Sequence, residues 1–116
     1  DLVAECKEFA AAAGSTVEVT DSLDVVEGAD VLYTDVWASM GQEAEAAQRK
    51  EIFVKYQIND EVMAVAKKDA MVQHCLPAHR GEEITAKVFE EHADEIVDEA
   101  ENRLHVQKAV LVKCMG

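Results

Sequence analysis

Residues 30–36 read DVLYTDV, and this mostly apolar run decides the expected fold class. Aliphatic, β-branched and aromatic side chains in such a run predict a buried strand, which here ends at polar residues. Residues 70–74 (AMVQH) predict a second strand, and helical patterns separate the two runs. Strands that alternate with helices are typical of parallel sheets. We therefore predict an α/β fold in which these two inner strands are neighbours.

Further elements are expected around the two strands. The spacing of apolar residues predicts a helix over residues 2–13 that stops at Gly14. A brief helix is expected after a cap at Asp21 or Ser22, with Leu23, Val25 and Val26 on its apolar face, and it ends at Gly28. The other expected elements are helices over residues 43–50, 60–67, 85–91 and 101–114, and short strands over residues 16–19 and 95–98.

The composition is that of one globular domain. The chain has 116 residues, of which 49% are hydrophobic and 30% are charged. It is too short for a typical two-domain enzyme, and no apolar run approaches the ~20 residues that cross a membrane. Neither an initiator methionine nor a signal peptide precedes the first predicted helix. We therefore expect the chain to begin inside a larger protein.

Charge and cysteine content exclude several classes of protein. The net charge is −13, which argues against binding to nucleic acid or to an anionic membrane face. Three cysteines occur without a CxxC pair, a pattern that favours a reducing cytosol over a disulfide scaffold. We therefore expect a cytoplasmic protein.

Three polar segments are expected where parallel strands end, which is where such sheets bind ligands. They are residues 35–41, 74–81 and 99–103. The first and the last have a purely structural alternative: Asp35 and Ser39 could cap the next helix, and Arg103 could form a surface ion pair with a neighbouring glutamate.

The middle segment offers groups that resemble other kinds of site, but the patterns are weak. His74, Cys75, His79 and Arg80 have no standard zinc spacing, so we expect no metal. No third group identifies Cys75 as a nucleophile with a histidine base. Neighbours in a strand point to opposite sides, so His74 and Cys75 fit one inward structural residue and one site residue. A cis Leu76–Pro77 bond is conceivable in the turn that follows.

Four segments together resemble one enzyme family. They are GADVLYTDVWASMGQE (28–43), YQIN (56–59), HCLPAHRGEEIT (74–85) and DEAENRLHVQKA (98–109). In this order they closely resemble the carboxyl-terminal part of the ornithine carbamoyltransferases. The resemblance is strong over residues 28–111, and residues 1–27 are compatible with it. Aspartate carbamoyltransferases carry a His-Pro-Leu-Pro type segment instead of residues 74–77, and putrescine carbamoyltransferases lack the Ser-Met-Gly loop seen at residues 39–41.

The resemblance implies a fold and a reaction. It implies a Rossmann-like three-layer parallel sheet flanked by helices, incomplete because its first strand is missing. Residues 1–116 would then be a single partial domain that binds ornithine, without the domain that binds carbamoyl phosphate. Family enzymes transfer the carbamoyl group of carbamoyl phosphate to the side-chain amine of ornithine, giving citrulline and phosphate. They act in arginine biosynthesis as homotrimers and need no metal or organic cofactor.

The resemblance also assigns roles to six residues. The ornithine-binding residues would be Asp35, Ser39, Met40 and Cys75; those that contact carbamoyl phosphate would be Cys75, Leu76 and Arg103; the catalytic residues would be Asp35, Cys75 and Arg103. The phosphate-binding segment of the family lies in the absent domain, so we expect the chain alone to be inactive. A second hypothesis is that the chain acts only as an ornithine-binding or interaction module.

Overall fold

The computed structural model describes residues 1–38, 41 and 43–116. Its two strands are β1 (Val31–Thr34) and β2 (Met71–His74). The α-helices are α1 (Leu2–Ala13), α2 (Ala46–Phe53), α3 (Asp60–Val65), α4 (Ala86–Glu91) and α5 (Ala93–Met115). Three short 3-10 helices are η1 (Leu23–Val26), η2 (Glu43–Glu45) and η3 (Val54–Tyr56).

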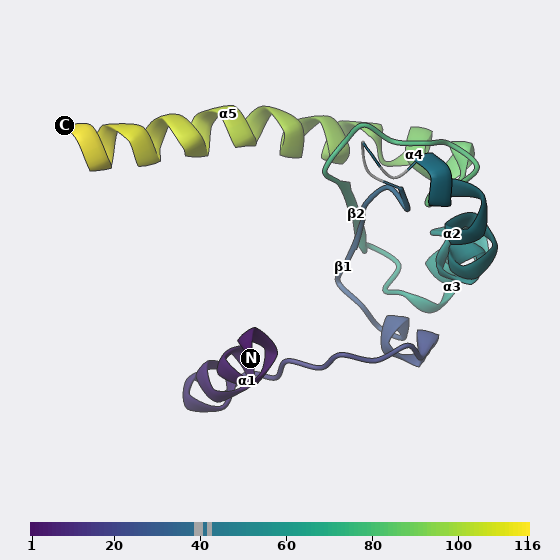
Figure 1. Ribbon diagram of the computed structural model, residues 1–116, viewed down its shortest axis with the longest axis horizontal. Helices are drawn as coiled ribbons and strands as arrows, with labels where there is room; N and C mark the ends of the chain where they lie inside the picture. The colour runs from purple at the N-terminus through teal and green to yellow at the C-terminus, as the bar shows by residue number, and fades with distance from the viewer. Residues whose placement is uncertain (39–40, 42) are drawn as a thin grey trace.

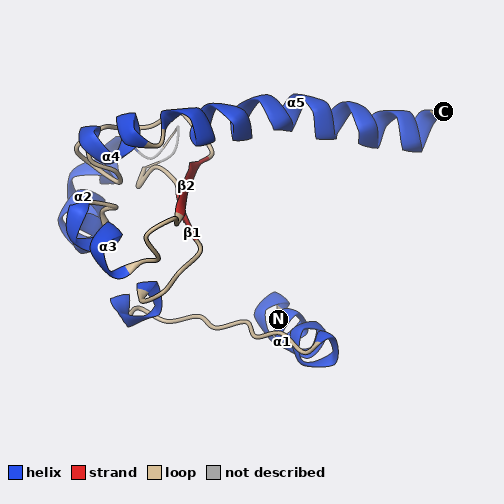
Figure 2. Ribbon diagram, turned by 180° about the vertical axis from the view of Figure 1, so that it is seen from behind, coloured by secondary structure: helices blue, strands red, loops and turns tan. Residues whose placement is uncertain are grey.

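The two strands form a parallel pair. Val31 lies opposite Met71, and Thr34 lies opposite His74, so the strands end side by side. The chain passes from β1 through α2 and α3 before it returns to β2, and Figure 2 shows these helices and α4 on one side of the strands. The expected α/β class and the pairing of the two apolar runs are confirmed, and a sheet of two strands fits an incomplete domain.

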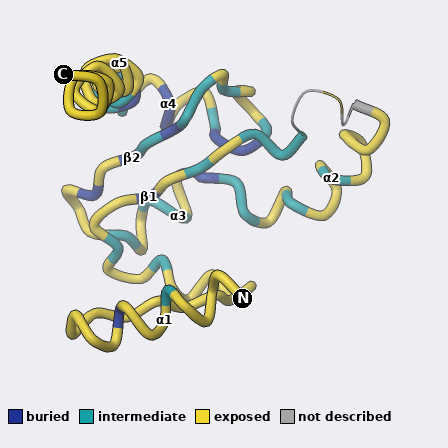
Figure 3. The backbone as a smooth tube through the Cα atoms, turned by 60° about the vertical axis from the view of Figure 1, so that its left-hand side comes forward, coloured by how far each residue is buried: buried dark blue, intermediate teal, exposed yellow. Residues whose placement is uncertain are grey.

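The core covers one face of the strand pair. Leu32 and Val72 point into it, whereas Val31, Tyr33 and Met71 on the opposite face are exposed. The buried cluster consists of Leu32, Ile58, Val72, Ile84, Val88, Phe89 and Ile96. In Figure 3 the buried stretches gather around β2 and α4, while α1 and α5 are mostly exposed. The face of the strand pair that carries Leu32 and Val72 is thus packed, and this packing fixes the positions of the strand ends.

Several helix boundaries follow from capping, as the sequence predicts. Asn59 begins α3, because its Oδ1 accepts hydrogen bonds from the backbone N–H groups of Glu61 and Val62 at 3.0 Å. Ser22 caps η1 in the same way. Gly14 ends α1 in the left-handed conformation, with φ 71°, that glycine adopts without strain.

Two expected strands are absent. Residues 16–19 form no strand; Val17 and Val19 are exposed, and no ladder holds them beside β1. Residues 95–98 belong to α5, which begins at Ala93 rather than at residue 101. Helix suits residues 95–98 because it buries Ile96 completely and brings two glutamates, one turn apart, to the free edge of β2.

Two helices extend away from this packed body. Figure 1 shows α5 projecting far beyond the strands, and α1 lying apart at the end of a long connecting segment. Only Ala10 of α1 and Ile96 of α5 are buried. Among the described residues, neither these helices nor any other combines the length and apolar character that crossing a bilayer requires.

Candidate functional site

A thiol and a carboxylate meet where the two strands end. Asp35 follows β1 and Cys75 follows β2, so the parallel register places them on neighbouring strand ends. The Cys75 Sγ–H donates to Asp35 Oδ1 at 2.9 Å, and the Val36 N–H donates to the same oxygen at 2.7 Å. The structure thus brings together two of the residues predicted from the sequence.

The protonation states of this pair are complementary. Burial, then the hydrogen bond to Asp35 and its negative charge, raise the pKa of Cys75 to about 11. The hydrogen bond from Cys75 leads in lowering the pKa of Asp35, and the Val36 N–H adds to that effect. At neutral pH the pair is therefore a protonated thiol and a charged carboxylate. This state disfavours Cys75 as a nucleophile and leaves Asp35 able to attract a cationic group.

A buried histidine supports the backbone next to Cys75. The Leu76 N–H donates to His74 Nδ1 at 2.8 Å, so the proton of a neutral imidazole lies on Nε2. His74 Nε2 lies 2.8 Å from Glu83 Oε1, and both side chains are fully buried. The Leu76–Pro77 peptide bond is cis. His74 thus faces inward while Cys75 faces the site, as the alternation along a strand predicts.

Arg103 lines an open pocket next to the pair. This pocket has a volume of about 620 Å³ and is lined by Cys75, Leu76, Pro77, Ala100, Arg103, Leu104 and Gln107. Among the described residues no carboxylate pairs with Arg103, because Glu99 bonds Tyr33 and His74 while Glu101 pairs with His105. The surface ion pair that was the structural alternative for Arg103 is therefore not formed, and the guanidinium remains available to a ligand.

The sequence prediction missed the structural roles of three residues at this end of the sheet, which are Tyr33, Glu83 and Glu99. Glu83 holds His74, and Glu99 accepts hydrogen bonds from the Tyr33 hydroxyl at 2.9 Å and the His74 N–H at 3.1 Å. The charge of Glu99 also contributes to the raised pKa of Cys75. Glu83 lies next to the buried Ile84, and no local pattern in the sequence signals that a glutamate at this position points inward.

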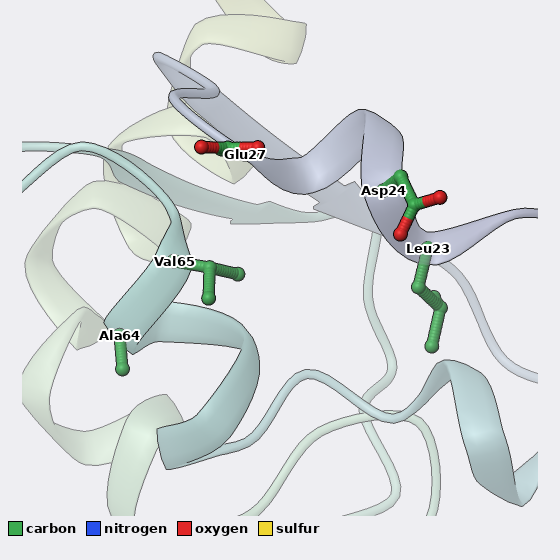
Figure 4. A pocket seen from close by; sticks show the side chains of 5 residues that line it. All are labelled: Leu23, Asp24, Glu27, Ala64 and Val65. Carbon is green, nitrogen blue, oxygen red and sulfur yellow. The ribbon is translucent and has the colours of Figure 1, made fainter.

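Two predicted site residues lie outside the described residues, and a second pocket lies away from the predicted site. Ser39 and Met40 are among the residues that the structure does not describe. A second pocket, of about 540 Å³, lies between η1 and α3 and is lined by Leu23, Asp24, Glu27, Ala64 and Val65 (Figure 4). Because η1 and α3 precede the strands, this pocket lies at their amino ends and holds none of the predicted residues. The carboxyl end therefore remains the candidate site.

Comparison with known proteins gives a consistent family. Residues 1–114 match the family described as "Aspartate/ornithine carbamoyltransferase, Asp/Orn binding domain". The ornithine carbamoyltransferase of Prochlorococcus marinus is 60% identical over 94 residues, which are 81% of this chain and 30% of that protein. That of Thermosynechococcus vestitus is 52% identical over 115 residues, covering 99% of this chain and 37% of that protein.

A solved structure agrees with these sequences. The anabolic ornithine carbamoyltransferase of Campylobacter jejuni matches with a TM-score of 0.84 and 42% identity, over 90% of this chain and 35% of that chain. This chain spans about a third of the length of the curated relatives it matches. The chain therefore belongs to the aspartate/ornithine carbamoyltransferase family, and it corresponds to the Asp/Orn-binding domain of that family.

Proposed function

We propose that this chain is the ornithine-binding part of an ornithine carbamoyltransferase. The single observation that carries the proposal is the 2.9 Å contact between Cys75 Sγ and Asp35 Oδ1 at neighbouring strand ends. This pair lies beside the pocket that Arg103 lines. The full enzyme would move the carbamoyl group from carbamoyl phosphate to the side-chain amine of ornithine, forming citrulline and releasing phosphate.

The pair at the strand ends would receive the reacting amine. Asp35 stays charged at neutral pH, so it would attract the cationic side chain of ornithine. Cys75 stays protonated and would orient the amine after the amine loses its proton, as attack requires. Ser39 and Met40 would bind the rest of the amino acid. Positioning of this kind contributes several kcal/mol to lowering a barrier.

The other substrate would lie along Leu76 and α5. The backbone carbonyl of Leu76 would accept a hydrogen bond from the carbamoyl group, and the His74 contact holds that backbone in place. Arg103 would contact carbamoyl phosphate and stabilise the oxygen charge that develops during transfer. In this proposal Asp35, Cys75 and Arg103 are the catalytic residues.

The complete protein would be larger than this chain. We propose that an amino-terminal domain supplies the phosphate-binding groups, so that residues 1–116 alone are inactive. The complete enzyme would be a cytoplasmic homotrimer in arginine biosynthesis. The alternative, a module that binds ornithine without catalysis, is supported only by the chain's spanning about a third of its relatives. Consumption of carbamoyl phosphate, with and without the amino-terminal domain, distinguishes the two.

Steady-state citrulline formation by full-length variants tests the assigned site. Asp35→Asn should weaken ornithine binding by about 1–3 kcal/mol, because a charged hydrogen bond is lost. Cys75→Ala should lower the rate by around a hundredfold through misplacement of the amine. Arg103→Lys should raise the KM for carbamoyl phosphate, because an ammonium group cannot make a bidentate contact.

Two matched variants control for nonspecific effects. Asp24→Asn alters the pocket at the opposite end of the strands, and Cys114→Ala removes an exposed thiol near the end of α5. Both should keep the unaltered rate. Unaltered rates in both Asp35→Asn and Cys75→Ala would show that the site is assigned wrongly.

A further inference from the structure

One buried carboxylate oxygen is left without a partner. Glu83 is fully buried, and its Oε1 lies within hydrogen-bonding distance of His74 Nε2, at 2.8 Å, and the His79 N–H, at 2.6 Å. Its Oε2 is buried and has no hydrogen bond. Across the described residues, no lysine or arginine nitrogen lies within 4.0 Å of this carboxylate. A buried oxygen of this kind is costly unless a cation or a donor approaches it.

The free oxygen points into a group of metal-binding side chains. His79 Nδ1 lies 4.0 Å from Glu83 Oε2, and the ligand atoms of His79, Glu82 and Glu83 all lie within 4.8 Å of one another. A tight turn holds these residues together, because the Glu82 N–H bonds the His79 carbonyl at 2.9 Å. The Gly81 N–H closes the same turn on Ile84 O at 2.8 Å.

From this cluster we propose a binding site for a divalent transition metal, with Zn²⁺ as the fitting probe. Zinc binds nitrogen and oxygen ligands at about 2.0–2.2 Å in a tetrahedral arrangement, so two ligand atoms of one ion lie roughly 3.4 Å apart. The 4.0 Å separation between His79 Nδ1 and Glu83 Oε2 is about 0.6 Å longer than this spacing, so the two atoms must move closer together when the ion binds. The His79 side chain is 54% exposed, so its ring can rotate and bring Nδ1 closer to the carboxylates of Glu82 and Glu83.

Charge favours a cation at this position. Two carboxylates and one imidazole suit an imidazole-binding divalent metal better than Mg²⁺, which prefers oxygen ligands alone. Lys50 Nζ lies 3.2 Å from Glu82 Oε1, which leaves the other oxygen of that carboxylate for a metal. Arg80 pairs with Glu90 at 2.8 Å and stacks over the Phe89 ring, so its charge is directed elsewhere.

The metal would stabilise the segment that carries Cys75 and Leu76. Glu83 contacts His74, and His74 in turn holds the Leu76 N–H. A metal on Glu83 Oε2 would hold the Glu83 carboxylate in place, and with it His74 and the Leu76 backbone, and would link this carboxylate to His79. The site is separate from the transfer chemistry, for which no metal is expected, and it does not depend on the proposed function.

Calorimetric titration of the 116-residue chain with ZnCl₂ in a non-thiol reductant tests the site, with MgCl₂ as the comparison. We expect saturable binding of one Zn²⁺ per chain that Mg²⁺ does not displace. His79→Ala and Glu82→Gln each remove one of three ligands and should weaken zinc binding at least about tenfold. Both residues are at the surface, so neither change disturbs the core.

Matched variants separate this site from other zinc-binding groups. His105→Ala removes a histidine from a similar exposed pair, 3.0 Å from Glu101, and should bind zinc unchanged. Cys75→Ser should also bind unchanged, which excludes the thiol as a ligand. Zinc should raise the unfolding temperature of these two variants as much as that of the unaltered chain, and that of His79→Ala by less. Absence of saturable binding, undiminished affinity in His79→Ala, or loss of binding in Cys75→Ser would each overturn the proposal.

Discussion

Cys75 keeps its proton because partial burial and the neighbouring Asp35 both disfavour the thiolate, which raises its pKa to about 11. A thiol in this state can donate a hydrogen bond to an acceptor on a ligand, but it reacts slowly with electrophiles. Asp35 is exposed and charged at the same strand ends. The two side chains therefore offer one neutral donor and one anion within 2.9 Å of each other.

Removal of the Asp35 charge should make Cys75 more reactive. Asp35→Asn removes the carboxylate's hydrogen bond and charge but leaves the burial of the thiol, so the pKa should fall only partly toward 9.0. A fall of one pKa unit gives about tenfold more thiolate at neutral pH. Iodoacetamide labelling followed by mass spectrometry measures the rate, and the exposed Cys114 in the same chain serves as internal control. Equal labelling of Cys75 in both proteins would contradict this account.

The sequence predicted the parts of the site that depend on strand ends. Asp35 and Cys75 each follow an apolar run, and parallel pairing then brings them together without further information. The His74–Glu83 contact could not be predicted in this way, because it depends on how the segment after β2 folds back into the core. The sequence offered Glu99 as a possible ion-pair partner of Arg103, whereas its carboxylate binds groups of both strands.

At the scale of elements, the edge of β2 that faces away from β1 has its N–H groups satisfied by side chains of α5. The N–H groups of Val72 and His74 point away from β1, and they donate to Glu95 and Glu99 of α5 at 2.9 and 3.1 Å. These glutamates are one helical turn apart, which matches the spacing of alternate N–H groups along a strand. Two carboxylates thus satisfy donors that a neighbouring strand would otherwise bind.

Loss of the Glu95 carboxylate should destabilise the fold. Glu95→Ala leaves the N–H of the fully buried Val72 without its acceptor, at an expected cost of about 1–3 kcal/mol in the free energy of unfolding. Urea denaturation measures this cost, and hydrogen exchange should accelerate at the Val72 amide. Glu101→Ala is the control, because within the described part of the chain Glu101 pairs only with the exposed His105. If the Val72 amide exchanges equally slowly in Glu95→Ala and Glu101→Ala, then Glu95 does not protect it.

The same contact gives a pH dependence. Burial opposes ionisation of Glu95, but the Val72 N–H and His92 outweigh burial, and the pKa is lowered from 4.5. A lowered pKa stabilises the folded state above the unfolded value and loses this effect as the pH falls through the folded value. The difference in stability between the unaltered chain and Glu95→Ala should therefore shrink as the pH is lowered below 4.5.

The secondary structure was predictable where local signals agree. Asn59, Ser22 and Gly14 mark helix ends because caps act through neighbouring backbone groups. Residues 95–98 (EIVD) place two adjacent β-branched residues between two acidic ones, a pattern that a helix also tolerates. The helix prevails there because it aligns Glu95 and Glu99 with β2, and single-segment patterns contain no information about that contact.

At the scale of the molecule, much apolar surface lies outside the packed body. Figure 1 shows α5 extending beyond the strands, and its exposed apolar residues are Val97, Leu104, Val106, Val110, Leu111, Val112 and Met115. On α1, Leu2 and Phe9 are 74% and 67% exposed. Exposed apolar patches of this kind are typical of surfaces that bind other protein.

The isolated chain should therefore self-associate through α5. Leu104 and Leu111 are two turns apart on one helix face, so Leu104→Glu with Leu111→Glu should shift the chain toward monomer in light scattering. Ile52→Glu with Val54→Glu adds the same charge at equally exposed positions outside α5 and should leave the association unchanged. The net charge of −13 opposes association, so added salt should strengthen it by screening the repulsion between chains. A single monomeric species at high protein concentration and high salt would show that these apolar faces do not bind one another.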